Sequence, residues 1–324
     1  MREGEGTKQA GRGRGLFRTA ILLVLLLYVL WSLSTQWHLF VDALSPSRLP
    51  WLAAALVLSL AATLLIGLRQ MILLSDTPER VGFKRSVEVT FAGEFANNIL
   101  PAGTGTDLVR LLYFRGAGGR TADIAGGLIV LDRLLGMIAL GGVAGAAFIP
   151  LTMLTPGSAS AAGALLRTVL AILAVLLFGL LALRSRALRG VVWGGKTLQG
   201  ILGSLHEQTK RGRTILAVTL LAVAGHLLGM VSVGCIALGV SSPTEAATGA
   251  LLSPLVFFAA SVPVTPSNLG WTEAMAEATW TAFGLHGGLI VFLLRRLVSV
   301  VASLLGVGAY CKLMRSGRQQ PPAA

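Results

Sequence analysis

Six apolar runs of about 20 residues constrain the fold of this chain more than any other feature. A run of that length matches a helix that crosses the hydrocarbon core of a bilayer. Of the 324 residues, 54% are hydrophobic and 13% are charged, whereas soluble domains carry about 25% charged residues. We therefore predict an all-α polytopic membrane protein with six full transmembrane helices: Leu16–Leu33, Trp51–Leu68, Ile124–Ile149, Gly163–Leu183, Thr214–Val240 and Gly287–Tyr310.

Basic residues set the expected orientation. The formal net charge is +13, and Lys and Arg gather at both termini and in loops 69–85 and 184–213. Cytoplasmic loops collect Lys and Arg, so we expect both termini in the cytoplasm of a bacterial-type inner membrane, and we expect no nucleic-acid partner. The predicted organisation is a disordered basic tail over 1–15, a single integral membrane domain over 16–311 and a polar cytoplasmic tail over 312–324.

Two polar breaks interrupt the apolar pattern, at about 86–116 and 246–285. The first contains Asn97, Asn98, Pro101, Gly103 and Gly105 within a few residues. Non-helical backbone at membrane depth persists only inside protein or beside a water-filled cavity. Six crossings place every basic loop on the cytoplasmic side only if the chain leaves each break on the side of the membrane from which it entered. We therefore predict two oppositely oriented re-entrant helical hairpins.

An internal repeat supports this topology. Pro101 precedes Arg133 by 32 residues, and Pro263 precedes Arg295 by the same interval. Gly-Gly-Leu-Ile-Val occurs at 126–130 and again at 287–291. An inverted repeat with broken helices at its interface is typical of transporters whose site lies near the midplane. Repeat one is expected at about 51–149 and repeat two at about 214–310.

Each break offers a helix start that suits an anion. Thr106 or Asp107 can cap a helix after Gly105, and Thr265, Ser267 or Asn268 can do the same in the second break. Free N–H groups and a positive dipole end favour a negative ligand there. The expected substrate-binding residues combine polar break positions with charges inside the spans: Asn97, Asn98, Gly103, Gly105, Asp107, Arg110, Asp132, Arg133, Asn268, Glu273 and Arg295.

Structural explanations exist for several of these residues. Asp132 and Arg133 can neutralise each other or partners across the bundle, and Asp107 can serve only as a helix cap. Asn97 and Asn98 can satisfy carbonyl groups freed by the break. Paired-His metal motifs and phosphate-binding loops are absent, so we expect no metal and no cofactor, and we interpret the chain as a transporter rather than an enzyme.

The motifs resemble a known family. Four motifs, in this order and spacing, look like the lysylphosphatidylglycerol synthase transmembrane (flippase-like) family. They are Asn97-x-x-x-Pro101, Gly-Thr-Gly-x-Asp-x-x-Arg ending at Arg110, Leu-Asp-Arg-Leu-Leu-Gly over 131–136, and Gly270-x-x-Glu273. That family includes the membrane half of the bacterial multiple peptide resistance factor. The resemblance implies a lipid-translocating fold and family positions at Asn97, Pro101, Gly105, Asp107, Arg110, Arg133, Gly270 and Glu273.

The chain departs from the family pattern at three places. Many members carry Gly-Glu where this chain has Thr106-Asp107, and many carry Arg where it has Thr272. A Gly-rich segment is replaced here by Pro266-Ser267-Asn268. These differences bear on head-group preference, and without a lysyltransferase domain we do not expect aminoacyl-lipid synthesis.

Three functions follow as hypotheses. The first is an inner-membrane flippase for an anionic phospholipid or a polyprenyl-phosphate-linked lipid, with its head group between the two hairpins. The second is a membrane-embedded accessory subunit or enzyme acting on polyprenyl-linked sugars, and the third is a small-anion transporter. Membrane lipids are the expected partners, and a second copy of the chain or a lipid-modifying enzyme stays open as a protein partner.

Overall fold

The computed structural model describes residues 23–25, 27–31, 33–74, 81–99, 105–116, 122–155, 157, 159–184, 203, 205–207, 209–262 and 264–317. All regular structure in these ranges is helical, which confirms the predicted all-α class. The elements are α2 (Trp37–Ala43), α3 (Leu49–Leu74), α4 (Phe83–Ile99), α5 (Gly105–Gly116), α6 (Ala122–Leu154), α7 (Ala159–Arg184), α9 (Gly212–Leu238), α10 (Pro243–Ala260), η4 (Pro266–Asn268), α11 (Trp271–Thr281), α12 (Gly288–Ser303), η5 (Leu304–Gly306) and α13 (Val307–Gly317).

Among the described residues, four helices are long and apolar enough to cross a membrane: Leu49–Leu74, Gly126–Leu154, Gly212–Leu238 and Gly288–Arg315. A fifth span forms if Leu23–Thr35 and Trp37–Ala43, which meet at a bend of 74°, count as one. The chain is therefore a multi-pass membrane protein. These spans agree with four of the six predicted ones and, in bent form, with part of the first.

The predicted fourth span corresponds to α7, which has 26 residues. Within the described side chains of α7, Leu166–Leu181 is a shorter apolar helix. The loop expected at 34–50 contains the short helix α2, whose Trp37 and Phe40 rings stack with their centroids 5.7 Å apart. The tail expected at 1–15 lies outside the described residues.

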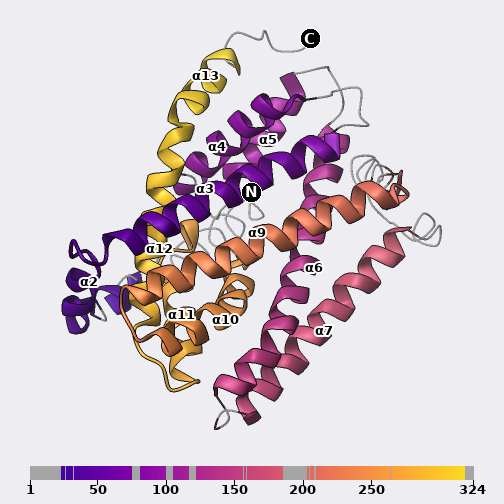
Figure 1. Ribbon diagram of the computed structural model, residues 1–324. Coiled ribbons are helices and arrows are strands. Elements are labelled where there is room, and N and C mark those ends of the chain that lie inside the picture. Colours follow the sequence, from indigo (N-terminus) through magenta and orange to yellow (C-terminus); the bar gives the residue numbers. More distant parts are fainter. Residues whose placement is uncertain are drawn as a thin grey trace, which may run out of the picture.

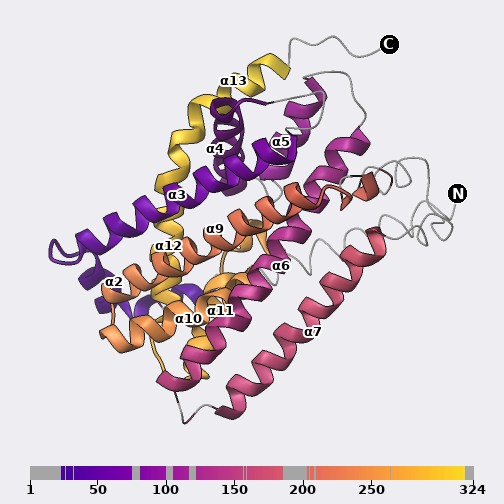
Figure 2. The same cartoon turned by 45° about the vertical axis from the view of Figure 1, so that its right-hand side comes forward.

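Helices α3 and α9 lie side by side through the middle of the molecule (Figures 1 and 2). Their contact is close because small residues meet there: Ala55 is fully buried, and the Ser232 hydroxyl donates to its carbonyl at 3.1 Å. Helices α6 and α10 pack against α9, and α7 packs on α6 at the edge of the bundle. On the other side, α4 contacts α3, α5, α12 and α13.

Arg69 was expected in a loop that starts where the second span ends, and that expectation is wrong. Helix α3 continues to Leu74, and Arg69 is buried in its last third. A guanidinium is tolerated at such a position only when paired, and the structure supplies the partner in Asp132.

Each predicted break separates two short helices that pack on one another, α4 with α5 and α10 with α11. The second break contains positive φ angles at Ser267 (51°), Asn268 (52°) and Gly270 (79°). The first break, including Pro101 and Gly103, lies outside the described residues, as does Pro263. The described residues thus show two packed helices in each predicted stretch, and non-helical backbone between them in the second.

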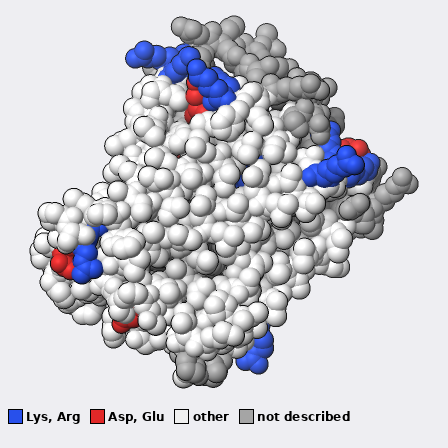
Figure 3. Space-filling view, viewed as in Figure 1, with Lys and Arg blue, Asp and Glu red and all other residues white. Residues whose placement is uncertain are grey.

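The surface shows how these helices meet lipid. The face in Figure 3 is mostly uncharged, and its charged side chains gather in small groups near its margins. Large apolar side chains are exposed along the helices, among them Val57, Phe178, Leu181 and Leu216. Such a broad apolar surface fits the hydrocarbon of a bilayer rather than water.

Candidate functional site

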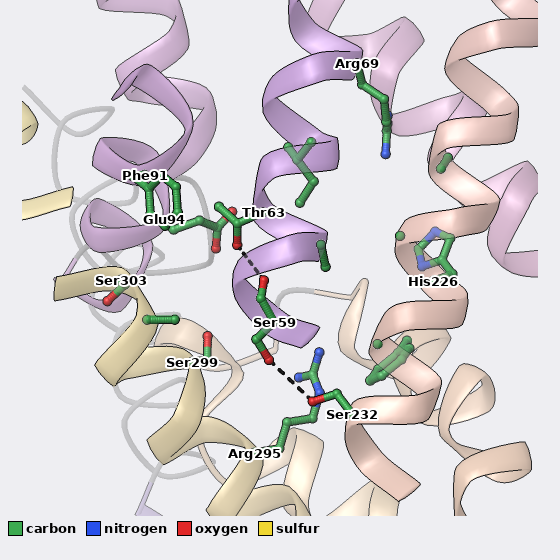
Figure 4. A pocket seen from close by; sticks show the side chains of 17 residues that line it. Ser59, Thr63, Arg69, Phe91, Glu94, His226, Ser232, Arg295, Ser299 and Ser303 are labelled. Carbon is green, nitrogen blue, oxygen red and sulfur yellow. Dashed lines mark hydrogen bonds between the residues drawn. The ribbon is translucent and has the colours of Figure 1, made fainter. Parts of the chain in front are cut away.

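A polar cavity of about 210 Å³ lies between α3, α4, α9 and α12, with Phe257 of α10 in its wall (Figure 4). A volume of this size has room for on the order of ten waters. Hydroxyl groups line it from three helices, and small residues of α9, such as Gly225 and Gly229, leave space for it. The chief polar lining residues are Ser59, Thr63, Arg69, Glu94, His226, Ser232, Arg295, Ser299 and Ser303.

Arg295 brings a positive charge into this cavity from α12. Its guanidinium carbon lies 4.5 Å from the centre of the Phe257 ring and 6.0 Å from that of Phe292. Figure 4 shows its guanidinium directed toward the part of the cavity that Ser59 and Ser232 line. In the described part of the chain the structure records no ion pair for Arg295. Its charge is therefore held by aromatic faces and open to the cavity.

Arg69 stands at the opposite end of the cavity and is neutralised differently (Figure 4). Its Nη2 atom lies 2.5 Å from Asp132 Oδ1, and it also donates to the Asp132 carbonyl at 3.0 Å. Arg110 Nη1 of α5 reaches Asp132 Oδ2 at 3.1 Å. All three side chains belong to residues less than a tenth exposed. One carboxylate of α6 thus ties α3 and α5 together through two guanidinium groups.

The neighbouring Arg133 takes part in a different pair. It forms a salt bridge with Asp107, in the first turn of α5. The Arg133 side chain is 55% exposed and that of Asp107 is 24% exposed. Neither residue lines the cavity, so the structure does not bring this predicted pair into it.

The second break has a buried counterpart of this pair. Arg296 Nε lies 2.6 Å from Oε1 of Glu273, which is fully buried in the first turn of α11. The other carboxylate oxygen of Glu273 accepts the Gly270 N–H at 2.8 Å. Arg296 also donates to the carbonyls of Ser267 and Asn268, at 3.0 and 3.2 Å. The positive φ angles of the break are therefore held in place by one arginine and one carboxylate.

The two pairs correspond in their positions. Asp107 and Glu273 are each the third residue of a short helix, each follows a threonine (Thr106 or Thr272), and each pairs with an arginine of the next long helix. By this correspondence, the residue of the second half that occupies the position equivalent to Arg133 is Arg296, whereas the sequence spacing had indicated Arg295. Adjacent residues on a helix point about 100° apart, which frees Arg295 for the cavity.

The polar residues of the two breaks also meet one another. The Ser267 hydroxyl donates to the Asn97 carbonyl at 2.9 Å, across 170 positions of sequence. Asn98 donates its amide to the Ser303 hydroxyl at 2.9 Å, and Asn268 donates to the Ala260 carbonyl. Asn98 and Asn268 thus make side-chain contacts next to the breaks, whereas Asn97 takes part through its backbone carbonyl.

Gly105 has a packing explanation. An added Cβ would collide with the backbone of Ala96 and Asn97. The start of α5 can therefore approach the end of α4 only without a side chain there.

Ten of the eleven predicted site residues divide into three groups, and Gly103 lies outside the described residues. Arg295 lines the cavity. The second group forms ion pairs and comprises Arg110, Asp132, Asp107, Arg133 and Glu273, and the third makes contacts next to the breaks and comprises Asn97, Asn98, Gly105 and Asn268. Arg69, Arg296 and the serines of α3, α9 and α12 were missed. A serine in an apolar run carries no distinguishing signal, because a hydroxyl can bond to its own helix.

Comparison with known protein families matches residues 16–306 to the lysylphosphatidylglycerol synthase TM region. Comparisons with curated proteins and with solved structures give no match. The family match covers the span over which the motifs and their spacing resembled that family. Because it extends over most of the chain, from the first predicted span to η5, the protein belongs to the lysylphosphatidylglycerol synthase TM region family.

Proposed function

We propose that this protein is a lipid translocase of the inner membrane that binds an anionic phospholipid or a polyprenyl-phosphate-linked lipid by its head group. Membrane domains of this family are associated with lipid modification or flipping. The observation that carries the proposal is Arg295, a cation that faces a polar cavity without an ion pair in the described part of the chain. A charge at membrane depth costs about 3 kcal/mol unless it is paired or hydrated, and a bound phosphate would pair it.

The cavity suits a phosphate in its neutral donors as well as its charge. Ser59, Ser232 and Ser299 line it beside Arg295, and a guanidinium with hydroxyl donors is a common phosphate-binding set. The apolar tails would stay in lipid while the head group occupies the cavity. This arrangement needs no metal and no covalent chemistry from the protein.

We infer a transporter topology for this binding site. The pairs α4/α5 and α10/α11 would be re-entrant hairpins from opposite sides, with six full crossings and both termini in the cytoplasm. Two observations support an inverted repeat: the matching acid–arginine pairs, Asp107–Arg133 and Glu273–Arg296, and the Ser267–Asn97 bond between the breaks. Rocking of one repeat against the other would then expose the cavity to each leaflet in turn.

Reconstitution into liposomes tests the proposed function. Purified protein should speed the exchange of a fluorescent lipid between leaflets, where the lipid is either phosphatidylglycerol or a polyprenyl phosphate. Chemical quenching of the outer leaflet measures this exchange. Arg295→Gln should slow the exchange about tenfold or more, as expected for loss of one charge-assisted contact. Arg167→Gln, at an exposed position of α7, is the matched control and should keep the wild-type rate. Equal rates for wild type and Arg295→Gln, or no movement of either lipid, would overturn the proposal.

A further inference from the structure

Glu94 places a negative charge in the same cavity as Arg295. It projects from α4, and Figure 4 shows its carboxylate directed toward Thr63 of α3. Among the described lining residues it is the sole carboxylate. The structure records no salt bridge for it within the described ranges, and it shares the cavity with the charge of Arg295. A site built only to attract a phosphate would not need this acid.

The charged groups around Glu94 differ in whether they already have a partner. Arg69 and Arg110 are committed to Asp132, and Arg296 to Glu273. On α5, Asp107 is committed to Arg133. The titratable groups on elements packed against α4 or across the cavity also include Tyr113 of α5, under the Arg85 guanidinium, and His226 of α9, bonded to the Gly136 carbonyl. On α13 they include Tyr310, packed on Phe95, and further along Cys311, Lys312 and Arg315. Among the cations that line the cavity in the described part of the chain, Arg295 is therefore the one left to balance Glu94.

We propose that Glu94 is a proton-binding site, so that the protein takes up a proton together with an anionic head group. This inference rests on the proposed function of the same cavity. While the cavity is empty, the negative charge of Glu94 balances Arg295. A phosphate that binds Arg295 puts a second negative charge in the cavity, and the two anions repel each other. A proton taken from water onto the Glu94 carboxylate removes that repulsion, and release of the head group returns the proton to water.

Proton uptake links binding to pH. When one proton binds with the ligand, the dissociation constant rises by up to about tenfold for each pH unit above the titration of the carboxylate. A proton gradient across the membrane would then bias the direction in which lipid moves. Glu94 would couple lipid movement to the proton, and Arg295 would attract the anionic head group.

Calorimetry of the detergent-solubilised protein measures the proton directly. Dihexanoyl phosphatidylglycerol is the probe. It is titrated into the protein at one pH, in a series of buffers that differ in their ionisation enthalpy. The slope of the observed heat against buffer enthalpy counts protons, and we expect a value approaching one per bound probe for the wild type. Glu94→Gln should bring the count near zero and make the dissociation constant independent of pH.

Glu88→Gln is the matched control on the same helix. Glu88 pairs with Arg85 at 2.9 Å near the start of α4 and does not line the cavity. This variant should keep the wild-type proton count and pH dependence. Binding of the probe without proton uptake, or uptake that persists in Glu94→Gln, overturns the inference and leaves the proposed function standing. If Glu94→Gln fails to fold, the wild-type proton count decides alone. A wild-type protein that neither binds the probe nor moves lipid overturns both proposals.

Discussion

The two helix pairs of this molecule carry the same acid–arginine arrangement in different surroundings. In the first half, Asp107 and Arg133 meet where the arginine is 55% exposed. In the second half, Glu273 is fully buried, and Arg296 binds it together with two carbonyls of the break. The same pairing is thus peripheral in one half and part of the core in the other.

The remaining arginines show the opposite distribution. The first half and its neighbour α3 contribute Arg69 and Arg110, which share Asp132 in a buried cluster. The second half contributes Arg295, which has aromatic rings beside it and faces the cavity. The comparison teaches that buried charge in this fold serves two purposes. Paired arginines fasten helices together, whereas the one without an ion pair in the described residues faces the cavity, where we propose that it meets a ligand.

The largest effect on stability should follow from loss of Asp132. Asp132→Asn leaves two buried guanidinium groups without an anion, and we expect it to lower the free energy of unfolding by about 3–5 kcal/mol. Arg295→Gln removes a charge that pairs with no acid among the described residues, so it should lower the lipid exchange rate without lowering stability. Denaturation by sodium dodecyl sulfate in mixed micelles measures both variants. A large loss of stability in Arg295→Gln would erase the distinction between fastening and ligand-facing arginines.

The second largest effect on stability is expected at Glu273, and Asp107 is the corresponding acid for comparison. Glu273→Gln should cost about 3 kcal/mol because it breaks a buried pair that also holds the Gly270 N–H. Asp107→Asn should cost less, because both members of its pair are only partly buried and the Arg133 side chain is 55% exposed. The same mixed-micelle denaturation reads both. Similar losses in the two variants would show that the difference in burial has no energetic consequence.

A third, smaller effect concerns the tight contact at the first break. Gly105→Ala should destabilise the protein by about 1–3 kcal/mol, because its Cβ would collide with the backbone of α4 at Ala96 and Asn97. Gly142→Ala, where a Cβ would meet nothing within 4 Å, is the control and should be neutral or stabilising. If Gly105→Ala is tolerated as well as the control, the described packing of α5 on α4 is wrong.

The smallest effect lies at the solvent-facing start of the second half. Ser242 and Glu245 form a capping box at the N-terminus of α10, and hydrogen bonds from the Ser242 backbone N–H and hydroxyl hold the pKa of the Glu245 carboxyl below its ordinary value. A lowered pKa gives stability that is present above the unfolded value, near 4.5, and is lost as pH falls through the folded value.

Ser242→Ala should therefore cost about 1 kcal/mol at pH 7. It should also flatten the loss of stability between about pH 5 and pH 3, because part of the shift disappears with the hydroxyl. Thermal unfolding in detergent across this pH range checks both. An unchanged pH profile would show that the Ser242 hydroxyl does not contribute to the shift.

The general class and much of the organisation could be predicted from the sequence. Apolar runs predict α3, α6 and α9 because burial in lipid depends on composition and length. Glycine, proline and capping residues predict the two breaks for the same local reason. Asp107 was expected as a cap of α5 and lies instead at its third position, still in the first turn, where an acid is favoured.

The pairing of the charges could not be predicted in this way. Arg295 and Arg296 are neighbours in sequence, and only the rotation of α12 decides which meets Glu273 and which meets the cavity. Arg69 follows an apolar run, which is the pattern of a loop residue, but in the structure it is buried and paired with Asp132. Long-range partners of this kind depend on how the helices pack.

Photochemical labelling of the cavity tests the central claim most directly. A phosphatidylglycerol with a photoreactive group on its head group is bound to the reconstituted protein, irradiated and located by peptide mass analysis. We expect labels on the cavity-lining segments of α3, α9 and α12 around Ser59, Ser232 and Ser299, which excess unlabelled lipid prevents and Arg295→Gln abolishes. Labels confined to lipid-exposed positions such as Phe178 and Leu181, unchanged by Arg295→Gln, would contradict the account.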